Sequence, residues 1–303
     1  MILSIIICTY NRCDLLRLAL DSLHKQTKLG YELIVIDNNS SDETRDLVLN
    51  YKIENVDINY FLETSIGLSH ARNRGIVEAK GEYLAYIDDD CILPENWVAL
   101  AHNIIESSKP KMFGGPVFPF YQNSKPKWYK DKYLTFEFGK ISRCLDDKET
   151  LIGCNFFVKK SVFMEIDNFK PALGMNGEQI LYSEETEFQL RFCSISNENK
   201  LFYDPNLFVY HYARPDKLSL FWNIKAFVGK GKSNYLVKNV VEKTSKIHLL
   251  GRIINQLLKL AYFFSLGILF RSRDHYPFFQ NYIMERVQSH LKKYGFLIAQ
   301  LRN

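Results

Sequence analysis

The chain has 303 residues, 47% of them hydrophobic and 14% aromatic, which predicts a folded globular protein and excludes a mainly disordered one. The net charge of +5 is unevenly distributed: residues 217–303 carry 15 Lys and Arg against three Asp and Glu, a balance of +12, which leaves residues 1–216 at −7. An acidic body with a basic tail predicts cation chemistry in the first part and an anionic surface or substrate near the second.

The cysteines and the first residues indicate a reducing compartment. The chain has neither a CxxC pair nor the Cys/His spacing of a zinc motif, and several cysteines lie inside apolar runs, as free buried thiols do. Residues 1–7 lack a basic leader and a small-residue cleavage site, so we expect a strand there rather than a signal peptide, and a cytoplasmic protein. The six cysteines are Cys8, Cys13, Cys91, Cys144, Cys154 and Cys193.

Apolar periodicity predicts alternating strands and helices in the first hundred residues. Residues 3–9 form a β-branched run, typical of a strand buried on both faces of a parallel sheet. Further strands are expected at 31–36, 58–62 and 83–87, and helices after Asn11, which is expected to cap the first, at about 42–51 and at 67–79. This order predicts an α/β fold with a mostly parallel sheet and right-handed crossovers.

The pattern becomes less regular beyond a helix expected at 96–108. Strands are expected at 112–120, 153–159, 202–204 and 207–211, and helices at 161–167 and 184–193. Residues 121–150 are polar, aromatic and irregular, like long connections that carry substrate contacts. After Leu218 the pattern is helical.

Three consecutive carboxylates, Asp88, Asp89 and Asp90, follow the predicted strand at 83–87. Ligands of open α/β sheets bind beyond the carboxyl ends of the strands, and hard divalent ions take oxygen ligands. The triplet therefore indicates a site for Mg²⁺ or Mn²⁺. The alternative is a solvated turn that caps the helix near Trp97.

Several segments, in this order, resemble the family 2 glycosyltransferases of the GT-A fold, which are inverting and use nucleotide-sugar donors. The resemblance covers residues 3–235, and the combination is more specific than any single segment. The segments are SIIICTYNR (4–12), VIDNNSSD (35–42), GLSHARNRG (67–75), YIDDD (86–90), GCNF (153–156) and SEETEFQLR (183–191).

The resemblance implies a Rossmann-like GT-A catalytic domain over residues 1–216, with a nucleotide-binding half (1–110) and an acceptor-binding half (111–216), and a basic helical C-terminal extension over 217–303. It implies a hexosyl- or N-acetylhexosaminyl-transferase with Mn²⁺ or Mg²⁺ as cofactor. A UDP-sugar is the expected donor, and a saccharide or lipid-linked saccharide the expected acceptor.

Roles for individual residues follow from the same resemblance. The nucleotide would contact Thr9, Tyr10, Asn11, Asp37, Arg72, Asp88 and Asp89; the metal would be held by Asp90 and His211; and the sugar or acceptor would meet Gly153, Asn155, Glu184 and Trp128. The alternatives are a turn-making role for Asp37, a solvated charge for Arg72, a structural role for His211 and a small satellite core for the aromatic Trp128.

An inverting transfer needs a base that takes the proton of the acceptor hydroxyl. The family usually has Glu-Asp where this chain has Glu184-Glu185, so position assigns the base to Glu185. The additional methylene moves that carboxylate by up to about 1.5 Å. The alternative is that Glu184, Glu185 and Glu187 only complement a helix dipole.

The C-terminal helices leave two interpretations open. The uncharged run 260–270 is shorter than the roughly 20 residues of a bilayer crossing, and Lys and Arg flank it. One interpretation is a helix lying peripherally on an anionic membrane, at the inner face of the cytoplasmic membrane. The other is a helical subdomain that packs on the protein or forms a homodimer. No nucleic-acid-binding module is recognisable.

Two other classes of protein compete with the transferase. One is a catalytically silent nucleotide- or glycan-binding protein on the same fold, for which the Glu185 departure is the best support. The other is a dinucleotide-binding dehydrogenase, which the lack of a GxGxxG sequence after the first strand disfavours.

Overall fold

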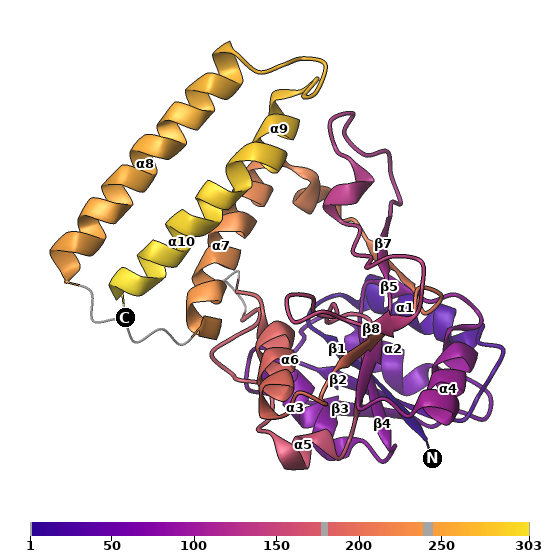
Figure 1. Ribbon diagram of the computed structural model, residues 1–303. Helices are drawn as coiled ribbons and strands as arrows, with labels where there is room; N and C mark the ends of the chain where they lie inside the picture. The colour runs from indigo at the N-terminus through magenta and orange to yellow at the C-terminus, as the bar shows by residue number, and fades with distance from the viewer. Residues whose placement is uncertain (1, 177–180, 239–244, 303) are drawn as a thin grey trace. The chain divides into compact units, whose positions relative to one another are not determined.

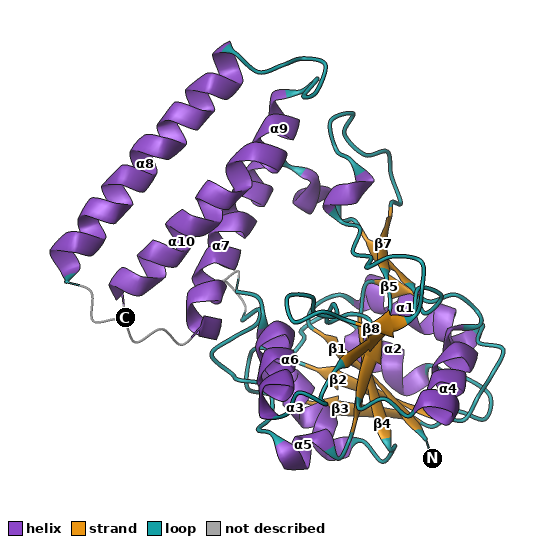
Figure 2. Cartoon of the chain, in the orientation of Figure 1, coloured by secondary structure: helices purple, strands orange, loops and turns teal. Residues whose placement is uncertain are grey.

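The computed structural model describes residues 2–176, 181–238 and 245–302. The chain forms two compact units (Figure 1). The first comprises Met1–Phe120, Leu134–Ala172 and Glu184–Tyr212, and the second Tyr121–Tyr133, Leu173–Ser183 and Ala213–Asn303. Within the described residues, the strands lie in the first unit, and the second consists of helices and loops (Figure 2).

The first unit is built on a mixed sheet that confirms the predicted α/β fold. Among the described residues this sheet has eight strands in the order β3-β2-β1-β4-β9-β6-β10-β8. The neighbours β3, β2, β1 and β4 are all parallel, whereas β9 runs antiparallel to both β4 and β6. The strands are β1 (Leu3–Thr9), β2 (Tyr31–Asp37), β3 (Ile58–Leu62), β4 (Tyr83–Asp88), β6 (Met112–Gly114), β8 (Arg143–Cys144), β9 (Phe156–Lys159) and β10 (Leu201–Tyr203).

The expected strand at 112–120 is divided between two sheets. Its second part, β7 (Val117–Phe120), joins a three-stranded sheet with β11 (Val209–Tyr212) and β5 (Cys91–Ile92). The division falls at Gly115 and Pro116. A Cβ at Gly115 would lie 1.8 Å from the Leu207 carbonyl oxygen, so only glycine lets the two backbones approach this closely.

Helices cover both faces of the large sheet, and side chains alternate along β1 accordingly. Ile5 and Ile7 pack in one core cluster with Leu16 and Trp97, whereas Ile6 packs in the other with Ala71. This double burial is what the β-branched run predicts. The helices of this unit are α1 (Cys13–His24), α2 (Thr44–Asn50), α3 (Leu68–Glu78), α4 (Trp97–Ser108), α5 (Val162–Glu165) and α6 (Glu184–Ile195).

The predicted cap of α1 is wrong. Asn11 has a positive φ of 52°, and its side-chain oxygen accepts from Ser41 N at 2.7 Å. Asp42 supplies the acceptor instead, with Cys13 N at 2.9 Å from its Oδ2. Two loops that are thirty residues apart in sequence are thereby tied together, which no local capping rule predicts.

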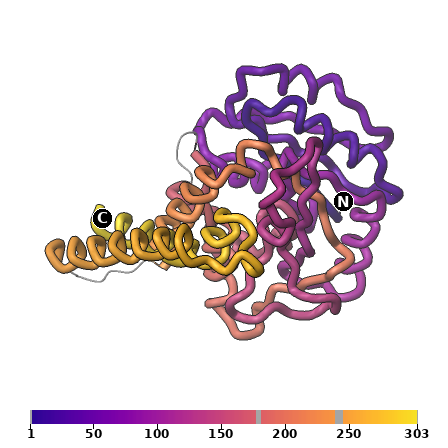
Figure 3. Tube along the Cα trace, turned by 90° about the horizontal axis from the view of Figure 1, so that it is seen from above, coloured from indigo at the N-terminus to yellow at the C-terminus, as the bar shows by residue number. Residues whose placement is uncertain are grey.

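The second unit is helical, as predicted for the tail. It contains α7 (Leu220–Lys238), α8 (Lys246–Leu269), α9 (Phe279–Tyr282), a π-helical turn at Ile283–Val287, α10 (Gln288–Arg302), and 3₁₀ turns at Asp131–Tyr133 and Pro215–Leu218. Helix α10 packs along both α7 and α8 (Figures 1 and 3). Among the described residues, α8 is the one helix long and apolar enough to cross a bilayer, and 22% of its most apolar stretch is buried.

Candidate active site

Three parallel strands deliver the first group of site residues to one edge of the sheet. In the register of the sheet, Thr9 at the end of β1 pairs with Asp37 at the end of β2, and Cys8 pairs with Asp88 at the end of β4. Their carboxyl ends meet at the position where open α/β sheets bind ligands. Asp37 and the Asp triplet therefore share one rim, as the sequence predicts.

The middle carboxylate of the triplet holds the rim together. Asp89 is 2% exposed and accepts from Thr9 Oγ1 at 2.8 Å and from Arg12 Nη1 at 2.9 Å. Burial raises the pKa of Asp89 to about 6, although Arg12 opposes the shift. From the sequence, no role is predicted for Arg12. The feature that could have pointed to Arg12 is its position as a basic residue in the loop directly after β1.

The outer two carboxylates converge on His211. The Nε2 atom of His211 lies 3.1 Å from Asp90 Oδ1 and 3.7 Å from Asp88 Oδ2. Strand β11 brings the histidine there, because its antiparallel pairing with β5 places His211 opposite Cys91. Burial alone would lower the pKa of His211, but the carboxylates of Asp90 and Asp88 outweigh it and raise that pKa well above its usual range.

The donor set of Asp88, Asp90 and His211 fits a divalent cation. One ligand atom from each residue lies within 4.8 Å of the other two. Two carboxylates with an imidazole suit Mn²⁺, and Mg²⁺ favours the oxygens. Without a metal, the two carboxylates favour a proton on His211. A bound cation would supply that positive charge instead.

Asp37 is buried and held by two partners. Its Oδ1 accepts from Ser40 N and its Oδ2 from the Tyr60 hydroxyl, both at 2.8 Å. The neighbouring Asn38 bonds to the Glu63 and Ser65 carbonyls, so the loop after β2 is fixed to the loop after β3. These bonds fix the carboxylate in place at the rim. Tyr10, in the loop after β1, is 42% exposed.

A buried arginine connects the Asp triplet to helix α6. Arg72 on α3 is 3% exposed; its Nη1 donates to Glu184 Oε1 at 2.6 Å and its Nη2 to the Gly153 carbonyl at 3.2 Å. Nη2 also lies 3.9 Å from Asp88 Oδ1. Its guanidinium lies 5.6 Å from the Phe169 ring centroid, a cation–π contact. The arginine is therefore buried and paired rather than a solvated helix charge.

Gly153 leaves the room that this arginine needs. A Cβ at Gly153 would lie 2.7 Å from Arg72 Nη2 and 3.3 Å from Glu185 Cγ. The missing side chain thus lets Arg72 and Glu185 approach the same turn. The structure brings Gly153 and Glu185 together, although 32 positions separate them.

The two glutamates at the start of α6 have different surroundings. Glu184 is 4% exposed and is engaged by Arg72, whereas Glu185 is partly exposed. Burial, with Glu185 beside it, raises the pKa of Glu184 to about 8 against the influence of Arg72. Glu187 is occupied by Lys170 at 2.6 Å and Arg191 at 2.9 Å. Glu185 is thus the glutamate of this helix turn that is most accessible to a substrate.

Asn155 and Trp128 lie in other surroundings. Asn155 is fully buried; its Oδ1 accepts from Trp97 Nε1 at 3.1 Å and its Nδ2 donates to the carbonyls of Leu207 and Pro116 at 2.7 and 3.1 Å. It therefore binds protein groups from three segments. Trp128 belongs to the second unit, where its carbonyl accepts from Asn281 at 2.6 Å.

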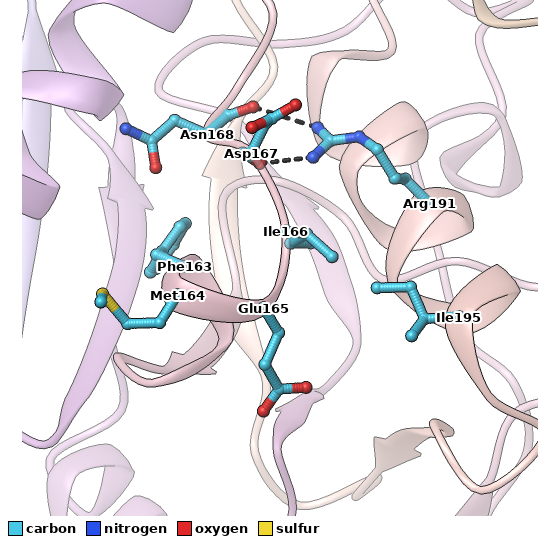
Figure 4. A pocket seen from close by; sticks show the side chains of 8 residues that line it. All are labelled: Phe163, Met164, Glu165, Ile166, Asp167, Asn168, Arg191 and Ile195. Atoms are coloured by element: carbon cyan, nitrogen blue, oxygen red, sulfur yellow. Dashed lines mark hydrogen bonds between the residues drawn. The ribbon is translucent and has the colours of Figure 1, made fainter.

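An open depression of about 540 Å³ between α5 and α6 lies apart from these residues (Figure 4). At one edge of it, Arg191 donates to the carbonyls of Asp167 and Asn168. Its walls contain none of the predicted site residues. The wall residues are Phe163, Met164, Glu165, Ile166, Asp167, Asn168, Arg191 and Ile195.

Sequence comparison places the chain among glycosyltransferases. It is 26% identical over 178 residues to the glycosyltransferase AglE of Haloferax volcanii, covering 58% of each chain. It is 39% identical over 90 residues to the GalNAc(5)-diNAcBac-PP-undecaprenol beta-1,3-glucosyltransferase of Campylobacter jejuni, covering 29% of each. The chain thus spans less than two thirds of the length of these relatives.

Structural comparison supports the same fold. The mannosyltransferase PcManGT of Pyrobaculum calidifontis, solved with GDP-Man and Mn²⁺, superposes with a TM-score of 0.61 at 14% identity, covering 98% of this chain and 85% of that one. At that identity the likeness shows the GT-A fold alone. The profile of glycosyl transferase family 2 matches residues 4–167, more than half of the chain. The carboxylates lie at the rim of a GT-A sheet, and the family profile covers more than half of the chain. The chain therefore belongs to glycosyl transferase family 2.

Proposed function

We propose that this chain is a metal-dependent inverting glycosyltransferase that moves a hexosyl or N-acetylhexosaminyl group from a nucleotide-diphosphate donor to a saccharide or lipid-linked saccharide. The observation that carries the proposal is the convergence of Asp88, Asp90 and His211 within 4.8 Å at the carboxyl edge of the sheet. Arg72 connects this cluster to α6, which carries Glu185. A catalytically silent binding protein is not favoured, because the relatives are named as glycosyltransferases.

The metal would be held by Asp88, Asp90 and His211. When bound, it would offset the negative charge that develops on the departing nucleoside diphosphate. Asp89, braced by Thr9 and Arg12, keeps the neighbouring carboxylates in place and leaves Arg12 beside the same rim. We assign the catalytic domain to residues 1–216, with the nucleotide half at 1–110 and the acceptor half at 111–216.

The nucleotide would lie along the loops after β1 and β2. The fixed carboxylate of Asp37 would accept the ring N–H of a pyrimidine, which favours a UDP-sugar, and Tyr10 and Asn11 flank the same rim. The neighbour PcManGT was solved with GDP-Man, so an experiment needs to test which nucleotide base this chain binds.

The catalytic base, which takes the proton of the acceptor hydroxyl, would be Glu185. It is partly exposed beside Gly153, whereas the carboxylate of Glu184 is engaged by Arg72. A carboxylate that is not already paired with a cation is better able to take a proton from an acceptor hydroxyl. Glu184 would hold the geometry of this turn, and Gly153 would contribute to sugar binding.

The exposed surface of α8 supports a lipid-linked acceptor. One face of this helix is buried, and the opposite face exposes apolar side chains at helical spacing, so the helix has apolar groups on two sides. A row of His248, Arg252, Asn255 and Lys259 borders the exposed face. The exposed apolar residues are Ile247, Leu250, Ile254, Leu257, Leu258, Tyr262, Ile268 and Leu269. We refer to these eight as the α8 apolar face.

We propose that the α8 apolar face rests on an anionic bilayer at the inner side of the cytoplasmic membrane. Residues 217–303 carry a balance of +12, which complements anionic lipid. The Campylobacter relative is named for an undecaprenol-linked substrate, and such a substrate resides in the membrane. A homodimer through the same face is the competing occupant.

The donor assignment is tested by calorimetric titration with UDP, GDP and their sugars in the presence of Mn²⁺. We expect UDP to bind and Asp37→Asn to lose affinity for UDP by about 10-fold or more, because a hydrogen bond to a charged group contributes about 1.5–3 kcal/mol. Asp46→Asn on the outer side of α2 is the control. Equal binding of UDP and GDP would contradict the pyrimidine assignment, and binding of neither would contradict the proposed activity.

A further inference from the structure

A second set of side chains that could hold a metal ion shares His211 with the acidic cluster. Cys91, Cys154 and His211 each place one donor atom within 4.8 Å of the other two. Cys91 directly follows Asp90 and pairs with His211 across β5 and β11. Cys154 lies in the turn that precedes β9. Residues 63 positions apart thus place two thiols against one imidazole, a grouping that no short zinc spacing in the sequence reveals.

The chemistry of these donors differs from that of the acidic cluster. Thiol sulfur with imidazole nitrogen is the preferred set for Zn²⁺, whereas carboxylates suit Mg²⁺ and Mn²⁺. With bond lengths of about 2.3 Å to sulfur and 2.0–2.1 Å to nitrogen, tetrahedral Zn²⁺ holds its donors roughly 3.5–3.8 Å apart. The separations between the three donors, each within 4.8 Å, therefore need to shorten by roughly 1.3 Å at most.

Because the site is buried, the charge of a bound cation has to be balanced by its ligands. The two cysteines are 0% and 3% exposed, so an isolated cation there would be strongly destabilised. Two thiolates and a neutral imidazole cancel the two positive charges of Zn²⁺. Binding would release two thiol protons to the solvent, together with the proton that His211 holds beside Asp88 and Asp90. The partly exposed side chain of His211 provides the way in from the rim.

We propose that the chain binds one Zn²⁺ through Cys91, Cys154 and His211, with water in the fourth position. Because His211 also serves the Asp88–Asp90 cluster, Zn²⁺ on its imidazole places a second doubly charged cation beside the transfer site. Repulsion between the two cations opposes binding of the transfer metal, so Zn²⁺ acts as an inhibitor. The binding step is independent of the proposed function, and only the inhibition rests on it.

Cobalt titration tests the binding step without any activity assay. The full chain, reduced and metal-free, is titrated with Co²⁺ while thiolate-to-cobalt charge-transfer absorption is recorded. We expect one equivalent to produce the band and Zn²⁺ to abolish it. Cys91→Ser and Cys154→Ser should lose the band, whereas Cys144→Ser, at an exposed cysteine, should keep it. A folded wild-type chain without the band, or a band that survives in both serine variants, overturns the proposal.

X-ray absorption of the Zn²⁺-loaded wild-type chain covers the case in which the serine variants do not fold. The proposal requires two sulfur neighbours at about 2.3 Å. A shell of oxygen and nitrogen alone would place Zn²⁺ on Asp88, Asp90 and His211 and would overturn it. In the transfer assay, Zn²⁺ added against Mn²⁺ should inhibit the wild type at least tenfold more strongly than Cys154→Ser, each normalised to its own activity. Equal inhibition would contradict the shared use of His211, whereas a cobalt band without transfer would contradict the proposed function alone.

Discussion

Arg72 Nη1 lies 2.6 Å from Glu184 Oε1, and both side chains are almost completely buried. Above pH 8, where Glu184 is ionised, removing the arginine leaves a carboxylate in the interior without its cation. We therefore expect Arg72→Ala to lower the free energy of unfolding by about 3–5 kcal/mol, the usual cost of breaking a buried pair. Urea unfolding measures this loss. Arg74→Ala is the control on the same helix, since its pair with Glu78 is partly exposed and should contribute at most about 1 kcal/mol. Equal losses in the two variants would contradict a special role for Arg72.

The raised pKa of Glu184 predicts a pH dependence of stability. Between its ordinary value of 4.5 and about 8, the folded chain holds a proton that the unfolded chain releases. Stability should therefore fall as pH rises through this window. Glu184→Gln should flatten that slope. The measurement is urea unfolding of both proteins at several pH values across the window, and an unchanged slope in the variant would contradict the assignment.

Glu185→Gln separates catalysis from binding. A positioned base typically contributes about 10²–10⁴ to the rate, so kcat should fall by that factor while the Kd for donor changes little. Steady-state kinetics and donor titration measure the two quantities. Glu187→Gln, in which the altered residue pairs with Lys170 and Arg191, is the control on the same helix turn. If Glu184→Gln abolishes kcat and Glu185→Gln does not, the base is the other glutamate.

The α8 apolar face predicts binding to anionic vesicles. Leu258→Asp and Asn255→Asp change the charge of the helix equally, but only the first alters the apolar face. Because burying a leucine contributes about 1.5–3 kcal/mol, Leu258→Asp should reduce co-sedimentation with phosphatidylglycerol vesicles by about 10- to 100-fold more than Asn255→Asp does. Vesicles of neutral lipid should bind the wild type less. A wild-type dimer that Leu258→Asp dissociates, without vesicle binding, would identify the face as a homodimer interface.

Much of the first unit could be predicted from the sequence, because its signals are local. The β-branched run of β1 and the strands ending at Asp37 and Asp88 are contiguous patterns, and parallel strands bring such ends to one rim. The break at Gly115 was not predicted. It depends on the close approach of Leu207, which is about ninety residues away in the chain.

The contacts within the site were harder to predict. Arg12 bonding to Asp89, and Arg72 to Glu184, join loops and helices from distant parts of the sequence. Asn155 shows the limit most clearly: its position suggested a sugar contact, yet its amide bonds to protein groups on three segments, which only the folded chain brings together. Side-chain partners of this kind depend on tertiary packing, for which a single sequence carries no local signal.

The most direct test is anomalous diffraction from crystals of the chain soaked with Mn²⁺ and UDP. We expect a manganese peak bound by Asp88, Asp90 and His211, with the diphosphate completing its coordination and the uracil beside Asp37. A manganese peak away from these three residues, or UDP bound elsewhere in the chain, would contradict it.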